Sequence, residues 1–318
     1  MDSKVKTNYP DSQWDTGVPE DFGLDSARLK AAVDEIYGIE KRYGVLVIKD
    51  GVIIHEKYRR GANAVNKIFS LTKGFGATLI GIAQQQGMLS VHDKISDWLP
   101  VHHPEITADA EIRHVLNMTA SEAPAGNRWR YNSNFILNSL TGILWLASGR
   151  TPVEFYREFL KEPLQLSFDW PSNPRGWIQI GSQGPLPVIE TDHRDIARLG
   201  LLWLNQGSWG SEQILGADFV SEALTPAFPE ANGAYGYLWW LNSNQGIWRT
   251  TGGHSGTESR WFPEADENVF MALGAHGKVM IVVPDHNLIM VSMGETPQEQ
   301  SGAYLAKMMT AVYSFLPA

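Results

Sequence analysis

Residues 66–83 read Asn-Lys-Ile-Phe-Ser-Leu-Thr-Lys-Gly-Phe-Gly-Ala-Thr-Leu-Ile-Gly-Ile-Ala. This stretch contains Ser70 and Lys73 at an i, i+3 spacing, which places both side chains on one face of a helix. A serine hydroxyl is a weak nucleophile unless a nearby base removes its proton, and an amine one helical turn away can do so. The apolar residues that follow Lys73 predict a helix that opens at this pair. The pair is therefore a candidate catalytic site.

The spacing by itself is weak evidence. At ordinary usage of Ser and Lys, a chain of this length contains on the order of one Ser-x-x-Lys match by chance. Ser3 and Lys6 form such a match, in a polar terminus where no helical pattern would bury the amine. The assignment of Ser70 therefore depends on what the rest of the chain supplies.

The composition limits the classes of protein to consider. With 318 residues, 43% of them hydrophobic, and 12 tryptophans, the chain can build one large domain or two lobes around a substantial core. Its formal net charge of -9 and the lack of a basic run argue against a nucleic-acid partner. The chain has no cysteine, which removes disulfides, thiol nucleophiles and thiolate metal sites together.

The sequence gives no sign of a membrane segment or a bound cofactor. No apolar stretch reaches transmembrane length, and residues 1–10 lack the apolar segment of a secretory signal. We expect a cytoplasmic protein as the chain is written, or a periplasmic one if a signal peptide was removed. His102 and His103 are the best local metal candidates, but adjacent side chains point apart and no third ligand is near, so no metal is expected.

Hydrophobic patterns predict the order of helices and strands. A capped amphipathic helix over 27–37 precedes two β-branched runs about Asp50-Gly51, which predict a hairpin over 43–57. Mostly helical patterns follow, and strands return in the last third before a final amphipathic helix. The expected helices are 87–90, 93–100, 135–147, 152–159, 192–205 and 298–314, and the later strands are 235–242, 247–250, 269–273, 278–283 and 288–293.

This order predicts an α/β (α+β) fold in a single domain, with an antiparallel sheet flanked by the terminal helices and an inserted all-helical lobe. The sheet lobe is expected over about 1–73 and 226–318, and the helical lobe over about 74–225.

Two further segments complete a set of groups for acyl transfer. Residues 129–134 read Trp-Arg-Tyr-Asn-Ser-Asn and put Tyr131 in a polar loop between helical patterns. Residues 270–290 hold a glycine-framed strand entry, Gly274-Ala-His-Gly277, followed by a Pro-Asp turn and another apolar strand. A serine–lysine pair, a tyrosine loop and a late glycine-bearing strand are hard to reach together by chance.

In this order of motifs the chain resembles the serine β-lactamase and penicillin-binding-protein superfamily. It is most similar to the class C-like branch, which also holds esterases, D-aminopeptidases and 6-aminohexanoate-dimer hydrolases. The resemblance runs from about residue 45 to 293, and it implies a β-lactamase-like fold. Segments 46–51, 112–119, 195–200 and 235–240 also resemble framework segments of that branch, in the same order.

The resemblance implies roles for individual residues. Ser70 would be the acylated nucleophile, Lys73 its base, and Tyr131 the group that passes a proton to the leaving group. The oxyanion hole would be formed by the backbone N–H groups of Ser70 and Lys278. The third motif of the family falls on Ala275, His276 and Gly277, which would border the substrate.

Two departures from the family pattern bear on the substrate. The tyrosine motif has Ser133 where the family has asparagine, so either Asn132 or Asn134 is expected to take that role. The third motif has Ala275 in place of a leading cation that helps β-lactam-recognising relatives to hold a carboxylate. This argues against efficient β-lactam turnover, and His276 stays open between a wall of the site and a structural residue.

The sequence therefore predicts a serine hydrolase that forms a covalent acyl-enzyme on a carboxylic ester or a small amide. Two alternatives stay open: β-lactamase or D-Ala peptidase activity, and a catalytically silent binding module of the same fold. The expected partner is a small-molecule substrate, without metal or other cofactor, nucleic acid or membrane, and the oligomeric state is open. Four tryptophans are candidates for a pocket wall or for core packing: Trp129, Trp177, Trp239 and Trp240.

Overall fold

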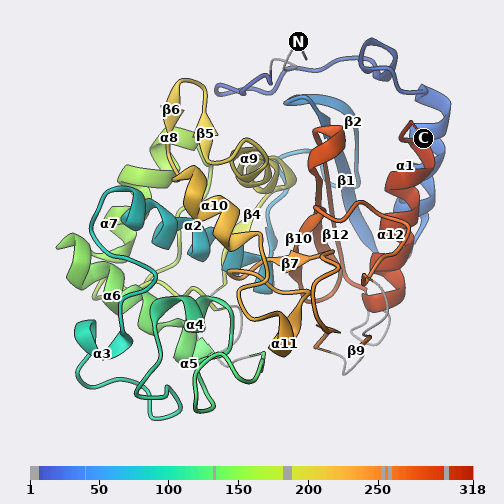
Figure 1. Cartoon of the computed structure of the whole chain (residues 1–318). Coiled ribbons are helices and arrows are strands. Elements are labelled where there is room, and N and C mark those ends of the chain that lie inside the picture. The colour runs from blue at the N-terminus through green and yellow to red at the C-terminus, as the bar shows by residue number, and fades with distance from the viewer. Residues whose placement is uncertain are drawn as a thin grey trace.

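A computed structural model describes residues 7–39, 41–131, 134–181, 188–251, 255–256, 260–296 and 301–317. Figure 1 shows the whole chain. Its α-helices are α1 (Ser26–Gly38), α2 (Thr72–Gln85), α3 (Ile95–Trp98), α4 (Ile112–Leu116), α5 (Asn134–Leu137), α6 (Ser139–Ser148), α7 (Pro152–Tyr156), α8 (Glu162–Leu164), α9 (His193–Leu204), α10 (Ala217–Ala223), α11 (Pro229–Asn232) and α12 (Ser301–Phe315). Short 3-10 turns lie at Pro19–Phe22, Phe69–Leu71 and Pro284–His286, and a π-helical turn at Arg157–Lys161 joins α7 to α8.

Most of the strand residues belong to one antiparallel sheet of six strands, in the order β2-β1-β12-β11-β10-β7. Its strands are β1 (Arg42–Lys49), β2 (Val52–Tyr58), β7 (Trp240–Leu241), β10 (Phe270–Gly274), β11 (Lys278–Val283) and β12 (Leu288–Gly294). Three two-stranded ladders lie outside it: β3 (Asn66–Lys67) with β4 (Glu190–Thr191), β5 (Ser208–Trp209) with β6 (Glu212–Gln213), and β8 (Trp248–Arg249) with β9 (Ser255–Gly256).

The first hairpin forms where the Asp-Gly pair predicted it. Asp50 and Gly51 both adopt positive φ, 52° and 80°, the backbone that a two-residue turn between twisted strands requires. The Asn287 side chain donates to the Asp50 carboxylate at 2.6 Å, and the backbone N–H of Asp50 donates to the carbonyl of Asn287 at 3.0 Å. The turn is therefore fixed both by its own residues and by the neighbouring end of β12.

The terminal helices α1 and α12 lie side by side on one face of the sheet, at the right of Figure 1. Tyr304 of α12 donates to Ser292 of β12 at 2.6 Å, which ties this helix to the central strands. This arrangement confirms the predicted α/β architecture with an antiparallel sheet flanked by terminal helices.

Helix α9 covers the opposite face of the sheet, although it lies within the segment expected to form the helical lobe. Gly200 allows the close approach, because a Cβ at that position would meet Met280 at 2.8 Å and Ile289 at 3.3 Å. The division into sheet and helical lobes stays a prediction, and α9 belongs by its packing to the sheet.

Three expected elements differ in the structure. Residues 87–90 form a turn and not a helix, because Gly87 at a φ of 69° ends α2. The expected helix 135–147 is divided at Asn138, whose side chain accepts from the backbone N–H of Ile180. The expected strand 235–242 is reduced to β7, because the N–H groups of Tyr237 and Leu238 donate to the carbonyls of Ala223 and Leu116, the last residues of α10 and α4.

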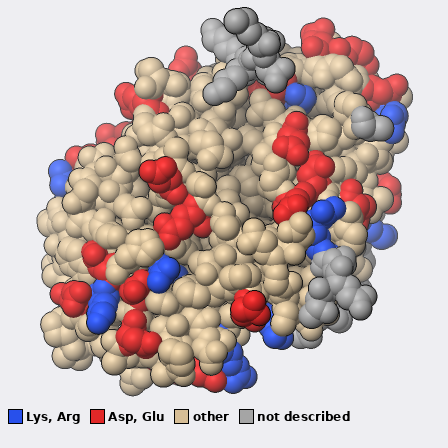
Figure 2. Space-filling view, in the orientation of Figure 1, with Lys and Arg blue, Asp and Glu red and all other residues tan. Residues whose placement is uncertain are grey.

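Charged side chains are mixed on the visible surface. Figure 2 shows Lys and Arg in small, separate groups on one face, with Asp and Glu between them. Among the helices that the structure describes, none is both long enough and apolar enough to cross a membrane.

His193, the first residue of α9, is buried at 2% exposure between the sheet and the Tyr58 ring. Gly44 of β1 makes room for it, since a Cβ there would meet the imidazole at 2.9 Å. Burial lowers the pKa of His193 to about 4, against a smaller opposing effect of the Gly44 backbone. The folded protein therefore holds this side chain neutral at pH values where the unfolded chain protonates it.

We expect this burial to make stability fall as the pH drops from about 6.5 towards 4. Below about 6.5 the unfolded chain binds a proton at His193 that the folded chain excludes, which costs on the order of 2.5 kcal/mol at about pH 4.5. The measurement is the free energy of unfolding by urea at about pH 7 and about pH 4.5. Between these two pH values, His193→Phe should lose about 2.5 kcal/mol less of this free energy than the unmodified protein. Equal losses in both proteins would contradict this role of His193. The free energy of unfolding of His193→Phe at about pH 7 shows separately whether phenylalanine fits the buried position.

Candidate active site

Ser70 lies in the 3-10 turn Phe69–Leu71, immediately before α2. The segment that leads to it is fixed by the pairing of β3 with β4 and by a hydrogen bond of 3.1 Å from the Ile68 N–H to the Ile189 carbonyl. Phe69 adopts a φ of 48°, a left-handed conformation that is uncommon for a bulky residue. The backbone is therefore sharply bent just before the candidate nucleophile.

The structure brings the serine and the lysine together. Lys73 Nζ lies 2.9 Å from Ser70 Oγ in a hydrogen bond, and the Lys73 side chain is only 3% exposed, whereas Ser70 is half-buried. The first turn of α2 can sit deep in the protein because Gly74 has no side chain. A Cβ there would meet Trp239 at 3.2 Å and Leu199 at 3.3 Å. Both predicted side chains thus share one site, with the amine inside and the hydroxyl towards solvent.

Tyr131 lies against the same pair. The Lys73 ammonium is 5.0 Å from the centroid of the Tyr131 ring. Three aromatic side chains surround this ring: Trp240 stacks on it with centroids 6.0 Å apart, Trp129 lies 6.1 Å away, and Tyr235 packs edge-on at 6.4 Å. The aromatic group consisting of Trp129, Tyr131, Tyr235 and Trp240, here called the aromatic wall, holds the tyrosine loop beside α2.

In the sequence, Tyr235 belongs to the framework segment 235–240 and carries no expected role of its own. Its hydroxyl is buried and has no hydrogen-bond partner among the described residues. Burial, together with the nearby Tyr131, raises the pKa of Tyr235 well above its ordinary value, so the hydroxyl keeps its proton. The density of aromatic residues over 235–240 was the available signal, but in the sequence it could not be told from core packing.

The end of β10 runs directly past the 3-10 turn Phe69–Leu71, here called the nucleophile turn because it carries the candidate nucleophile Ser70. A Cβ built on Gly274 would lie 2.1 Å from the carbonyl oxygen of Ile68, two residues before Ser70. No residue with a side chain can occupy that position without moving one of the two backbones. Gly274 therefore sets how closely the sheet approaches the site.

The third motif forms the turn between β10 and β11. Ala275, His276 and Gly277 join Gly274 to its partner Lys278, and His276 and Gly277 have φ values of 62° and 71°. Alternation along a strand therefore does not decide where the His276 ring points. The ring packs edge-on against Phe69 with centroids 5.2 Å apart, next to the nucleophile turn.

Two buried cations hold this turn from the inside. Arg42 is fully buried and donates to the Gly277 carbonyl at 2.8 Å and to the Thr296 hydroxyl. The Lys278 side chain is 1% exposed, donates to the Gly294 carbonyl and lies 3.3 Å from the Glu295 carboxylate. Burial lowers the pKa of Lys278, while Glu295 opposes that shift. The Lys278 side chain therefore packs beneath the turn, and only its backbone is a candidate for the oxyanion hole.

The residues that could replace the family's asparagine are only partly described. Asn132 and Ser133 lie outside the described residues, and Asn134 begins α5 without a described side chain. Which of them contacts a substrate stays a prediction.

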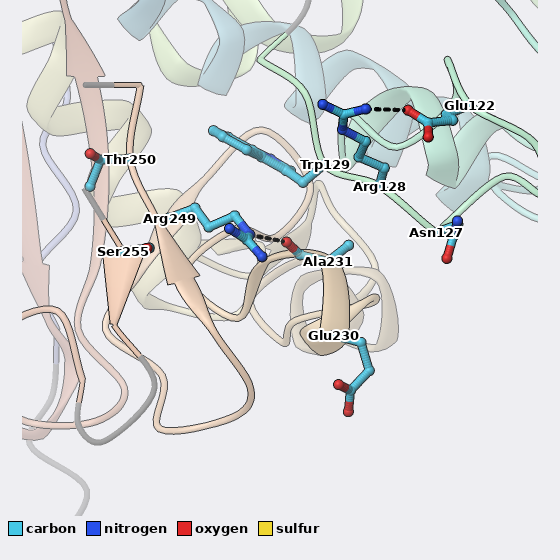
Figure 3. Close-up of a pocket in the computed structure, with 9 residues that line it drawn as sticks. All are labelled: Glu122, Asn127, Arg128, Trp129, Glu230, Ala231, Arg249, Thr250 and Ser255. Atoms are coloured by element: carbon cyan, nitrogen blue, oxygen red, sulfur yellow. Dashed lines mark hydrogen bonds and ion pairs between the residues drawn. The ribbon is translucent and has the colours of Figure 1, made fainter. Parts of the chain in front are cut away.

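A cavity of about 470 Å³ opens beside the aromatic wall (Figure 3). Trp129 belongs both to its lining and to the contacts of Tyr131, whereas Ser70, Lys73 and Tyr131 are not part of the lining. The lining comes from the loop before Tyr131, from α11 and from the β8–β9 ladder. It consists of Glu122, Asn127, Arg128, Trp129, Glu230, Ala231, Arg249, Thr250 and Ser255. No pattern in the sequence joins these segments.

The remaining sequence candidates serve packing or local contacts, Trp239 against the first turn of α2 and the others farther away. Trp239 packs on Trp203 with centroids 4.8 Å apart, and Trp177 packs on Trp145 at 5.7 Å. His102 Nδ1 lies 3.0 Å from the Leu99 carbonyl. In the described part of the chain, no group of three or more His, Asp or Glu side chains is arranged to hold a metal ion.

Several solved structures resemble the whole fold. A Bacillus anthracis protein provisionally assigned as a 6-aminohexanoate-dimer hydrolase superposes with a TM-score of 0.69 at 16% identity, over 96% of this chain and 89% of that one. A penicillin-binding protein homologue from Caulobacter crescentus also has a TM-score of 0.69, at 14% identity over 94% and 99% of the two chains. EstCE1, a hydrolase with promiscuous acyltransferase activity, has a TM-score of 0.65 at 14% identity over 91% and 98%.

These likenesses show a β-lactamase-like fold. The family model described as beta-lactamase matches residues 31–311, nearly the whole chain. The order of elements, the buried Ser70–Lys73 pair and this match agree: the chain belongs to the β-lactamase family and is a hydrolase of the serine β-lactamase and penicillin-binding-protein type.

Proposed function

We propose that this protein cleaves a carboxylic ester or a small amide through a covalent acyl-enzyme on Ser70. The observation that carries the proposal is the 2.9 Å hydrogen bond between Ser70 and a lysine that is almost fully buried. A half-buried hydroxyl with a buried amine within hydrogen-bond distance fits the requirement of a nucleophile next to its base.

In the acylation step, Lys73 takes the proton of the Ser70 hydroxyl as Oγ attacks the carbonyl carbon of the substrate. The carbonyl oxygen gains the negative charge and a tetrahedral intermediate forms. When that intermediate collapses, the bond to the alcohol or amine breaks and Ser70 keeps the acyl group. The proton taken from Ser70 leaves with the alcohol or amine.

Backbone N–H groups would stabilise the oxyanion, and Ser70 supplies the first of them. The family resemblance implies Lys278 as the second N–H donor, and its backbone lies on β11 opposite Gly274. Gly274, the last residue of β10, lies against the Ile68 carbonyl beside the nucleophile turn. This contact favours the N–H of Ala275, the residue that directly follows Gly274, as the second donor. We therefore propose Ser70 and Ala275 as the donors, with Lys278 as the alternative.

Tyr131 is proposed to pass the proton between Lys73 and the leaving group, and to return a proton from water during deacylation. Its ring lies 5.0 Å from the Lys73 ammonium, and the aromatic wall limits its movement. Water then attacks the acyl carbon, the acid product leaves, and Ser70 regains its proton.

The choice of an ester or amide is supported by what the structural neighbours are described to do. EstCE1 is described as a hydrolase with promiscuous acyltransferase activity. The Bacillus anthracis neighbour is provisionally described as a hydrolase of the 6-aminohexanoate dimer. Ala275 gives the third motif no cation, which weighs against β-lactams as the main substrate. The proposed substrate is a small molecule, and no metal or other cofactor takes part in the steps above.

Replacing Ser70 or Lys73 should abolish the reaction. We expect Ser70→Ala to give no covalent adduct with a fluorophosphonate and to lower kcat for aryl esters by at least about 10³-fold, and Lys73→Met to lower kcat by a similar factor. Intact-mass analysis and aryl-ester hydrolysis measure the two effects.

Ser3→Ala is the matched control, because Ser3 occupies the second Ser-x-x-Lys sequence of the chain. It should react like the unmodified protein. An adduct that persists in Ser70→Ala would refute the proposal. Nitrocefin turnover faster than that of every ester and amide would instead make the β-lactamase alternative the function.

Tyr131→Phe should keep the fold and lose proton transfer. The ring contacts with Trp129 and Trp240 do not need the hydroxyl, so thermal stability should change little. We expect kcat to fall by about 10²- to 10³-fold, with a smaller loss for esters that have an acidic leaving group, because such groups depart without a proton. If 4-nitrophenyl and alkyl esters are affected equally, Tyr131 does not protonate the leaving group.

A further inference from the structure

The cavity beside the aromatic wall has the size of a site for a small molecule. Its volume of about 470 Å³ falls within the range of about 300–1,000 Å³ that such sites occupy. Trp129 separates it from Tyr131, with ring centroids 6.1 Å apart. A substrate bound at Ser70 would reach the cavity by extending a second group past the Trp129 indole.

Arg249, the last residue of β8, presents its guanidinium to this cavity from a fixed backbone. Asn232 is fully buried, accepts from the Arg249 N–H at 2.9 Å and donates to the Arg249 carbonyl at 3.1 Å. The Nε of Arg249 donates to the Ala231 carbonyl at 3.0 Å, as Figure 3 shows. Within the described part of the chain, its two Nη groups have no hydrogen bond or ion pair, so they remain available to a ligand.

Among the described residues, no other charge of the cavity forms an ion pair with this guanidinium. Arg128 and Glu122 pair with each other at 2.9 Å, and the pair is neutral. The Glu230 carboxylate is exposed and points away from Arg249 in Figure 3. No carboxylate of the described residues lies within ion-pair distance of Arg249. The formal charges of the lining, two arginines and two glutamates, balance, and the unpaired positive charge is the Arg249 guanidinium itself.

We infer that the cavity binds a carboxylate of the substrate, and that Arg249 is the residue that recognises it. The two free Nη groups can donate in parallel to the two oxygens of one carboxylate, the geometry that makes arginine selective for this group. Ser255 of β9 lines the same cavity and offers a hydroxyl, and Trp129 offers an apolar face to the chain that links the carboxylate to the reacting carbonyl.

This inference rests on the proposed function and names the substrate class of the same site: an ester or amide with a free carboxylate at a distance from the bond that is cleaved. It assigns to Arg249 a role in specificity, and none in the covalent steps at Ser70.

Paired substrates test the inference on both sides of the scissile bond. On the acyl side, 4-nitrophenyl monoesters of succinic, glutaric and adipic acids are compared with the same compounds capped as methyl esters. On the leaving-group side, the butyrate ester of 3-hydroxybenzoic acid is compared with that of its methyl ester. We expect the free carboxylate to raise kcat/KM by about 10-fold or more in at least one of the two series.

Arg249→Gln should remove that preference, so that within this variant the free carboxylate and its capped partner have the same kcat/KM. Arg249→Lys should keep part of it, because the charge remains and the planar fork is lost. Arg175→Gln, which removes an exposed arginine outside the cavity lining, is the control and should keep the full preference. The inference is wrong if neither series shows a preference, or if the preference survives in Arg249→Gln.

A binding measurement separates this inference from the proposed function. In the Ser70→Ala protein, quenching of tryptophan fluorescence by 4-nitrobenzoate is compared with quenching by neutral 4-nitrobenzyl alcohol. We expect the benzoate to bind at least about 10-fold more tightly, and this difference to vanish when Arg249→Gln is added. Binding that depends on Arg249, in a protein whose Ser70 forms no adduct and hydrolyses nothing, would refute the proposed function alone. If Ser70 is acylated but kcat/KM depends neither on a free carboxylate in the substrate nor on Arg249, the inference alone is refuted.

Discussion

The close approach of the β10 backbone to the nucleophile turn is the constraint on which the site depends. Gly274 lies so near the Ile68 carbonyl that its Cα cannot carry a side chain. This contact brings the end of β10 to the start of α2, so one contact positions both the candidate nucleophile and the backbone proposed to hold the oxyanion. Phe69 and His276 adopt positive φ on the two sides of the contact, a conformation that costs on the order of 1 kcal/mol or more for each residue. The packing of their rings against each other supports both bends.

Three buried cations lie around this contact, and their hydrogen-bond partners differ. Burying a charge is costly unless hydrogen bonds replace its water. Arg42 donates to backbone carbonyls and to a hydroxyl, and Lys278 to a carbonyl and to Glu295, so both stabilise the turn between β10 and β11. Lys73 instead hydrogen-bonds the Ser70 hydroxyl at the edge of the site. Only Lys73 therefore has its amine next to a group that can react.

The aromatic wall divides the substrate region into two parts with different chemistry. On one side, Tyr131 lies against Lys73, where bonds are proposed to break. On the other side, Trp129 borders the cavity, where the two Nη groups of Arg249 have no partner among the described residues. This separation would let the protein recognise one end of a substrate while the other end reacts, so the residues that choose the substrate need not disturb those that perform catalysis.

The sequence by itself determined the architecture and the reactive pair. The Asp50-Gly51 turn, the apolar strands over 269–293 and the helix after Ser70 depend on local patterns, and such patterns form the same element in many surroundings. The order of the motifs also led to Tyr131, which the structure places beside Lys73.

Only the tertiary structure decided what borders the reaction site. The neighbours of Tyr131 include Trp240, which lies more than 100 positions away along the chain. The cavity joins the loop before Tyr131 to α11 and to β8. Arg249 gives no signal in the sequence, because an arginine shows its role only by the partners it has or lacks in space. The sequence can name residues whose chemistry is local, whereas a binding cavity depends on distances that only folding creates.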